Sequence, residues 1–218
     1  MAVVTVARQF GAGGETIGRL LADRLRADFL DTKLMDEVAR RLQLPDAEVA
    51  ARDENPGSLL SRLLTALGSA SVDLSAPPEV VAWTPPFSDP AFDTRQAVLN
   101  VSREVIREAA RSGNAVIVGR GGAYILRQTP GVTHVFLHAS FEHRVQVVMS
   151  TLGLPEAEAH RRVKQTDANR AAYVRQVYGH NWTDPGHYDL AFDTGRLDYE
   201  IVTDAIVLVI EERGRRNA

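Results

Sequence analysis

A glycine-rich turn follows the first apolar segment of this chain. Its residues run Arg8-Gln9-Phe10-Gly11-Ala12-Gly13-Gly14-Glu15-Thr16. Glycine has no Cβ atom, so it permits positive φ angles and a close approach of the backbone to an anion. When such a turn opens a helix, its N–H groups and the helix dipole both favour a phosphate group. The turn therefore predicts a phosphate cradle, and a plain tight turn between a strand and a helix is the alternative.

This turn departs from the G-x-x-x-x-G-K-[ST] phosphate-loop pattern. Gly14 occupies the lysine position, and Glu15 occupies the position of the hydroxyl residue that binds magnesium. Thr16 is the nearest hydroxyl, one residue further on, and is the predicted Mg²⁺ ligand. We hypothesise that Arg8, which flanks the glycines, or Arg120 replaces the lysine in space.

The elements that must position this turn follow an α/β pattern. Short β-branched runs alternate with amphipathic stretches, which is typical of a parallel sheet flanked by helices. Residues 2–7 are almost continuously apolar, so we expect a central strand covered on both faces. A helix is expected over residues 15–27. Further strands are expected over residues 29–31, 115–119, 133–138 and 188–193.

Length, charge and composition limit the classes of function. The 218 residues are expected to form a single domain over 1–218, and the net charge of -3 gives no global attraction to nucleic acid or anionic lipid. The absence of cysteine excludes disulfides, thiolate zinc sites and a cysteine nucleophile. No segment approaches the roughly 18 apolar residues of a membrane span. A soluble cytoplasmic protein that binds neither nucleic acid nor a membrane is the expectation.

One stretch, residues 43–93, interrupts the α/β pattern. It contains a leucine-rich helical segment followed by a run of prolines that breaks regular structure. We interpret it as an insertion over the sheet, since loops of this length are commonly functional or mobile. A small cap, a disordered loop and an oligomer contact all stay open, and the last of these would make a homodimer.

Blocks along most of the chain, taken in order, resemble the cytidylate kinase family. The motif Arg-Gln-Phe-Gly-Ala-Gly-Gly resembles a divergent cytidylate kinase-like subfamily. The loop and helix start, the second strand, the third strand, the fourth strand with its helix, the lid and the last strand each have a counterpart. These blocks are Gly11–Ile17, Phe29–Thr32, Val116–Gly122, Val135–Arg144, Asp167–Ala171 and Asp189–Thr194.

The resemblance implies a nucleoside monophosphate kinase. Its fold would be a three-layer P-loop NTPase-like parallel sheet of about five strands flanked by helices, with a lid over about 154–185. Its reaction would be transfer of the γ-phosphoryl group of ATP, with Mg²⁺, to a nucleoside monophosphate such as CMP or dCMP. The glycine loop from Gly11 to Thr16, together with Arg8, would bind the nucleotide.

The resemblance also implies which side chains act on the phosphates. Arg120 matches the phosphate-binding arginine after the third strand, and Arg170 with Asp167 matches the lid arginine and its acidic partner. Arg162 adds positive charge to the same stretch, so these four are the predicted catalytic residues. The alternative is that residues 161–175 are a solvated helix with charge pairs along its surface.

Two departures affect the acceptor. Glu37 stands where the family has a monophosphate-binding arginine, and Gly121 replaces an acidic residue. Asp31 and Thr32 match the family and are the predicted substrate-binding residues, with a helix N-cap as the alternative. A kinase for another small acceptor and a non-catalytic nucleotide-binding regulatory module therefore stay open.

Two groups of aromatic and histidine residues are less informative. His134, His138 and His143 lack metal-ligand spacing, so we expect no metal there. The segment with Trp182 and Tyr188, together with His180 and His187, either packs the base of the lid or stacks a nucleobase.

Overall fold

The first strand is the centre of a five-stranded parallel sheet in the order β2-β3-β1-β4-β5. The computed structural model describes residues 2–42 and 94–216, so the predicted insertion at 43–93 lies outside the described residues. The central place of β1 and the five predicted strands are confirmed. The strands are β1 (Ala2–Arg8), β2 (Asp28–Leu30), β3 (Asn114–Val118), β4 (Val132–His138) and β5 (Leu190–Asp193).

The last strand begins two residues later than the sequence predicts. A 3₁₀ turn, η1 (Pro185–His187), precedes it, and Tyr188 ends that turn by donating its N–H to the Pro185 carbonyl oxygen. The side chain of Asp184 accepts a hydrogen bond from Gly186 N at 2.9 Å and starts the turn. Tyr188 therefore ends the turn, and Asp189 N already donates to the His134 carbonyl oxygen of β4 at 2.8 Å.

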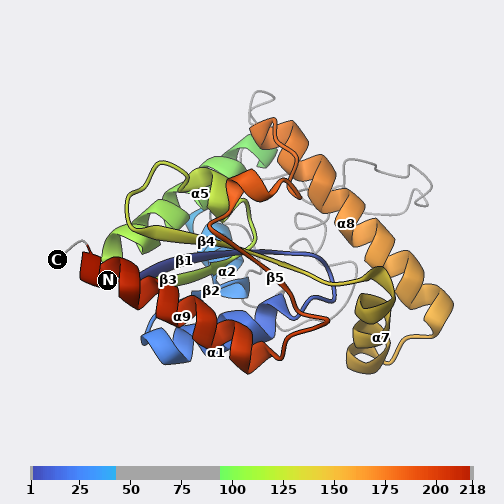
Figure 1. Cartoon of the computed structure of the whole chain (residues 1–218). Helices are drawn as coiled ribbons and strands as arrows, with labels where there is room; N and C mark the ends of the chain where they lie inside the picture. The colour runs from blue at the N-terminus through green and yellow to red at the C-terminus, as the bar shows by residue number, and fades with distance from the viewer. Residues whose placement is uncertain (1, 43–93, 217–218) are drawn as a thin grey trace.

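Two helical layers cover the sheet, as Figure 1 shows. On one face lie α1 (Gly14–Leu25) and α9 (Tyr199–Arg216), and on the other lie α2 (Thr32–Arg41) and α5 (Thr94–Ser112). Ile17 and Leu21 of α1 are fully buried against the first face. Burial of each side chain stabilises the folded state by about 2 kcal/mol. The predicted three-layer α/β architecture is therefore correct. The remaining helices are α6 (Gly122–Ile125), α7 (Phe141–Leu152) and α8 (Glu156–Tyr178).

The parallel register brings the strand ends to one edge. Val6 of β1 pairs with Val118 of β3, and Arg8 of β1 pairs with Leu137 of β4. Because parallel strands end at the same edge of the sheet, the turns after all five strands meet there. The long helix α8 belongs to the predicted lid segment and lies at this end of the molecule, beside α7 (Figure 1).

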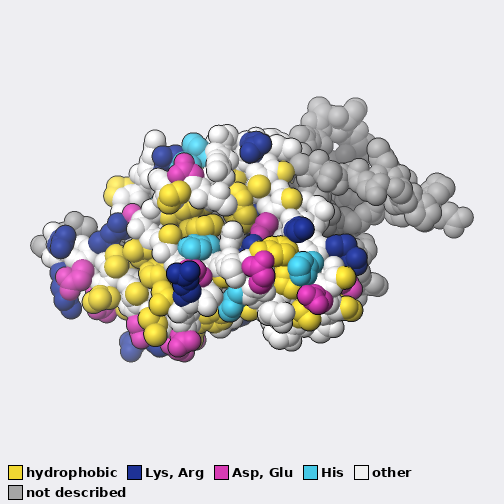
Figure 2. Space-filling model, turned by 45° about the vertical axis from the view of Figure 1, so that its right-hand side comes forward, with side chains coloured by type: hydrophobic (Ala, Val, Ile, Leu, Met, Phe, Trp, Pro, Cys, Tyr) yellow, Lys and Arg dark blue, Asp and Glu magenta, His cyan; other side chains and the backbone are white. Residues whose placement is uncertain are grey.

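The surface carries charges of both signs. On the face drawn in Figure 2, basic and acidic side chains are interspersed among apolar ones over the described part of the chain. Within residues 2–42 and 94–216, no helix combines the length and apolarity needed to cross a membrane.

Candidate active site

The glycine turn contains two left-handed backbone positions that favour glycine. Gly11 has φ 83° and Gly13 has φ 69°, and Gly13 caps the N-terminus of α1. A Cβ atom at Gly11 would lie 2.7 Å from the main-chain oxygen of Arg144, and one at Gly13 would lie 2.3 Å from the Tyr199 ring. Both positions therefore need glycine for conformation and for space. The strand, turn and helix predicted from the sequence are present in that order.

A buried ion pair fixes the loop from below. Arg144 of α7 is 6% exposed, and its guanidinium donates to the main-chain oxygens of Ala139 and Phe10 at 3.1 Å each. The same group donates to Asp167 Oδ2 at 2.5 Å, while Asp167 Oδ1 accepts from Phe10 N at 2.9 Å. The predicted lid acid, Asp167, thus holds the phosphate loop through its backbone, with Arg144 as a second partner.

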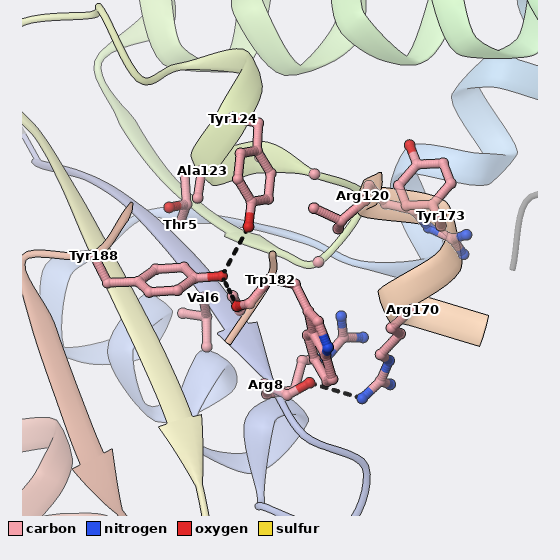
Figure 3. Close-up of a pocket in the computed structure, with 15 residues that line it drawn as sticks. Thr5, Val6, Arg8, Arg120, Ala123, Tyr124, Arg170, Tyr173, Trp182 and Tyr188 are labelled. Carbon is pink, nitrogen blue, oxygen red and sulfur yellow. Dashed lines mark hydrogen bonds between the residues drawn. The ribbon is translucent and has the colours of Figure 1, made fainter. Parts of the chain in front are cut away.

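Three arginines from three elements line one cavity at the sheet edge. Arg8 ends β1, Arg120 follows β3, and Arg170 belongs to α8. Arg170 Nη1 donates to the main-chain oxygen of Arg8 at 2.8 Å, which Figure 3 shows as a dashed line. The carboxylates near these arginines form only long ion pairs: Asp31 lies 3.9 Å from Arg8, and Asp167 lies 3.9 Å from Arg170.

These arginines repel one another in a site of low polarity. Burial lowers the pKa of Arg8, Arg120 and Arg170, and the charge of Arg8 lowers the pKa of the other two further. The pKa of Arg170 falls to about 9. A guanidinium stays protonated at neutral pH even so, and the positive charge is therefore only partly compensated by the two carboxylates. Such a cluster is an anion site by its electrostatics.

Arg120 has an unusual backbone conformation. Its φ is 52°, and it stands between Gly119 at φ 78° and Gly121 at φ 73°. A left-handed conformation costs a non-glycine residue about 1–2 kcal/mol, and such strain gathers at functional sites. The residue in this strained conformation is the predicted phosphate-binding arginine.

Two adjacent cavities meet at the arginines. The first, which we call the outer cleft, is about 340 Å³ in volume and is lined by the glycine loop, Thr16, Asp31 and Tyr199. The second, which we call the inner cavity, is about 60 Å³ and contains Arg120 with the aromatic residues of Figure 3. Arg8 and Arg170 line both. The outer cleft reaches the size of small-molecule sites, roughly 300–1,000 Å³, while the inner cavity suits only a small group in this conformation.

The structure does not gather every predicted residue at these cavities. Arg162 is an exposed residue of α8 and lines neither cavity. Ala12 is buried beneath the loop, and its carbonyl oxygen accepts from the buried Thr194 hydroxyl at 3.2 Å. Asp31 faces the outer cleft, whereas the side chain of Thr32 lies outside the described residues.

The outer cleft has the oxygen atoms that a magnesium nucleotide needs. Thr16 and Glu15 at the start of α1 and Asp31 after β2 all line it. Glu15 already pairs with Arg19 at 2.9 Å, so Thr16 and Asp31 are the less engaged oxygens. Mg²⁺ prefers oxygen ligands and commonly binds through one or two protein groups plus substrate phosphates. The residues present therefore fit Mg²⁺ brought by a nucleotide.

The histidine and aromatic segment packs against β4 and α8. Trp182 is 7% exposed and lies edge-on to Phe136 of β4, with ring centroids 6.0 Å apart. Tyr188 donates to the main-chain oxygen of Trp182 at 2.6 Å and lies 3.3 Å from the Tyr124 hydroxyl. Trp182, Tyr188 and Tyr124 also form one wall of the inner cavity, so packing here shapes the site directly (Figure 3).

Arg144 and Tyr199 are site residues that the sequence did not identify. Arg144 lies on the buried face of α7 with Val145 and Val148, a face that a sequence pattern assigns to apolar residues. A lone arginine on an apolar helix face signals a buried partner, and this signal was available. Tyr199 gave no such signal, because only the fold brings the start of α9 against Gly13.

Comparisons with known proteins identify the family of this chain. Residues 3–196 match the cytidylate kinase-like family, and the chain belongs to it. The chain is 30% identical over 118 residues to a cytidylate kinase from Methanopyrus kandleri, covering 50% of this chain and 61% of that protein. It is also 34% identical over 98 residues to a uronate isomerase from Corynebacterium glutamicum, covering 45% of this chain. The chain thus spans 19% and 61% of the lengths of these two curated relatives.

Solved structures share the fold. An uncharacterised protein from Eubacterium ventriosum superposes with a TM-score of 0.67 at 21% identity, over 97% of this chain and 99% of the other. A shikimate kinase from Bacteroides thetaiotaomicron gives a TM-score of 0.53 at 16% identity, over 96% and 98% of the two chains. The chain therefore has a P-loop NTPase-like fold, which it shares with a protein named shikimate kinase.

Proposed function

We propose that this protein transfers the γ-phosphoryl group of Mg-ATP to a nucleoside monophosphate, with CMP or dCMP as the acceptor. One observation carries the proposal. Arg8 and Arg170 stand at the boundary of two cavities, with Arg120 in the inner one. The outer cleft would take the phosphates of ATP, and the inner cavity would take the phosphate of the acceptor.

The chemistry asks mainly for positioning and positive charge. In phosphoryl transfer, negative charge is spread over the oxygens of the moving group while donor and acceptor stay in line. The N–H groups of the loop from Gly11 to Gly14 would hold the donor phosphates, and the arginines would stabilise the charge between the two sites. Bound Mg²⁺, held by phosphate oxygens with Thr16, would neutralise further charge.

A kinase for a different small acceptor is the second candidate. The inner cavity of about 60 Å³ is smaller than a nucleoside. Gly121 stands where an acidic residue is implied, and the Tyr178 ring fills that space, 2.5 Å from where a Cβ would be. Glu37 is engaged with Arg40 and Arg41 at 2.6 Å and 2.7 Å. The fold is shared with a protein named shikimate kinase, so it is not tied to nucleotide acceptors.

The test is ADP release from Mg-ATP with CMP, dCMP, UMP, AMP or no acceptor. We expect turnover that depends on CMP or dCMP and falls about a hundredfold or more in Arg120→Ala, since a lone transition-state arginine has effects of this size. Arg26→Ala, an exposed arginine at the end of α1, is the matched control and should keep full turnover.

The remaining outcomes separate the alternatives. Turnover with none of the four nucleotides, but with ATP still bound, would refute the nucleotide acceptor. A screen of small phosphorylatable metabolites would then separate a kinase for another acceptor from a nucleotide-binding regulatory module, since only the kinase releases ADP in response to an acceptor.

A further inference from the structure

The cation of the phosphate-loop pattern has changed places with a glycine in this chain. The pattern G-x-x-x-x-G-K, aligned on Gly13, spans residues 8–14, which read Arg-Gln-Phe-Gly-Ala-Gly-Gly. Arg8 stands at the first glycine of the pattern, and Gly14 stands at its lysine. The loop therefore keeps one cation and the same number of residues, but the cation enters from the strand end instead of the helix end.

The side chain of Arg8 occupies the space that a lysine at position 14 would need. A Cβ atom at Gly14 would lie 2.4 Å from Arg8 Cγ and 2.9 Å from Arg8 Cβ. The Cβ atom is fixed by the backbone of β1, and Cγ can move only by a change of the χ1 rotamer of Arg8. A side chain at 14 and the arginine at 8 are thus mutually exclusive, and Gly14 is needed because of Arg8.

A second glycine admits the other end of the same side chain. A Cβ at Gly119 would lie 1.9 Å from Arg8 Nη1, so the guanidinium rests directly on the turn after β3. Within residues 2–42 and 94–216, this guanidinium makes no hydrogen bond, and its ion pair with Asp31 is long at 3.9 Å. Its donors therefore lie at the junction of the two cavities without a hydrogen-bond acceptor among the described residues.

We infer that Arg8 performs the task of the phosphate-loop lysine from the opposite end of the loop, and that Gly14 and Gly119 form the groove that admits it. The inference rests on the proposed function for the identity of the ligand, a nucleoside triphosphate. A lysine in this loop reaches the β- and γ-phosphates. A guanidinium presents a planar pair of donors, so Arg8 can bind two phosphate oxygens at once.

Reversing the exchange tests the inference. Four variants are compared with wild type by calorimetric titration with Mg-ATP and with inorganic triphosphate: Arg8→Met, Arg8→Gly, Gly14→Lys and the double variant Arg8→Gly/Gly14→Lys. Arg8→Met keeps an apolar stem between the two glycines and removes only the charge. We expect it to weaken binding of both ligands by about tenfold or more, as for loss of a charge-assisted hydrogen bond. Arg26→Ala, an exposed arginine at the end of α1, is the charge control and should bind as wild type.

The double variant gives the decisive comparison. Gly14→Lys alone should lower the melting temperature, because its side chain collides with the arginine stem. In the double variant the collision is gone and the cation is restored, so both melting temperature and ATP affinity should return toward wild type. A folded double variant that binds no better than Arg8→Gly would overturn the exchange, as would wild-type affinity in Arg8→Met.

The result can be separated from that of the kinase proposal. Wild-type protein that binds ATP but never releases ADP refutes the proposed reaction and leaves the exchange intact. Wild-type turnover that persists undiminished in Arg8→Met refutes the exchange and leaves the reaction intact.

Discussion

The Arg144 guanidinium and the Asp167 carboxylate lie 2.5 Å apart and join α7 to α8 beneath the glycine loop. Both also contact the backbone of Phe10, through its carbonyl oxygen and its N–H group respectively. The glycine loop and α8 are thus held by the same pair of charges. A movement of α8 must therefore either carry the loop with it or break this pair.

Breaking the pair should cost much of the folding free energy. Arg144→Met leaves a largely buried Asp167 without its strong partner, and we expect a loss of about 3–5 kcal/mol in the free energy of unfolding. Asp167→Asn keeps an acceptor for Phe10 N, so we expect a smaller loss of about 1–3 kcal/mol in the free energy of unfolding. Urea denaturation measures both. Arg162→Ala, exposed on the same helix, should stay within about 0.5 kcal/mol of wild type.

Substitutions at the two arginines with a left-handed backbone conformation should distinguish a role in function from a role in stability. Arg120 (φ 52°) and Arg26 (φ 49°) are the non-glycine residues with positive φ among those described. Glycine relieves this conformation, so Arg26→Gly at the end of α1 should raise the free energy of unfolding by up to about 1 kcal/mol. Arg120→Gly should also keep or raise stability, because it removes a repelled charge as well.

Their activities should differ. Arg26→Gly should retain the phosphoryl transfer rate, whereas Arg120→Gly should lose it and still show the rise in melting temperature that Mg-ATP causes, because Arg120 lines the inner cavity and not the outer cleft. Thermal melts with and without Mg-ATP measure this. A lowered stability of Arg120→Gly would show that Arg120 has a structural role, contrary to this prediction.

Gly121 and Gly131 offer a matched pair for the wall of the inner cavity. Both have positive φ, 73° and 80°, but a Cβ at Gly121 would meet the Tyr178 ring at 2.5 Å while nothing lies within 4 Å at Gly131. Gly131→Ala should cost only the backbone strain, about 1 kcal/mol. Gly121→Ala should cost more because it displaces Tyr178. It should also raise the KM of the acceptor, because Tyr178 stacks on Tyr124 of the inner cavity with ring centroids 5.1 Å apart. Equal costs in urea denaturation would contradict this account of the wall.

The order of strands and helices could be predicted from the sequence, because the strands of a parallel sheet are buried on both faces and are therefore apolar along their length. The unbroken apolar run of β1 identified the central strand, and the glycine turn marked the entry to α1. Contacts between residues far apart in the chain could not be predicted from the sequence. Periodicity shows that one face of a helix is buried without showing against what, so neither Arg144 with Asp167 nor Tyr199 against Gly13 was foreseen.

The arginine cluster falls between these cases. Arg120 and Arg170 were identified through the resemblance, and Arg8 because it flanks the glycine loop. The structure brings all three to the inner cavity. Arg162 was identified on charge alone, and the structure leaves it exposed. The left-handed conformation of Arg120 had no signal in its own residue type, because arginine rarely adopts it.

Acid should weaken the sheet through His134. This residue of β4 is 9% exposed, and its Nδ1 lies 2.7 Å from the Thr5 hydroxyl of β1. Burial lowers the pKa of His134 below its ordinary value of 6.5. Above that value both the folded and the unfolded chain hold a neutral ring, so this residue adds no pH dependence there. As the pH falls through 6.5, the unfolded chain takes up a proton first, and the free energy of unfolding declines until the folded pKa is passed.

The decline for one such group is at most about 1.4 kcal/mol per pH unit. Urea midpoints between pH 7.5 and 5.0 should therefore fall in the wild type and fall less in His134→Asn. Burial also lowers the pKa of His187, so the wild-type slope contains both residues and only the difference between the two proteins isolates His134. Thr5→Val keeps the buried ring and should keep the slope, although it lowers stability at every pH. An unchanged slope in His134→Asn would show that the ring is not the acid-sensitive group of the sheet.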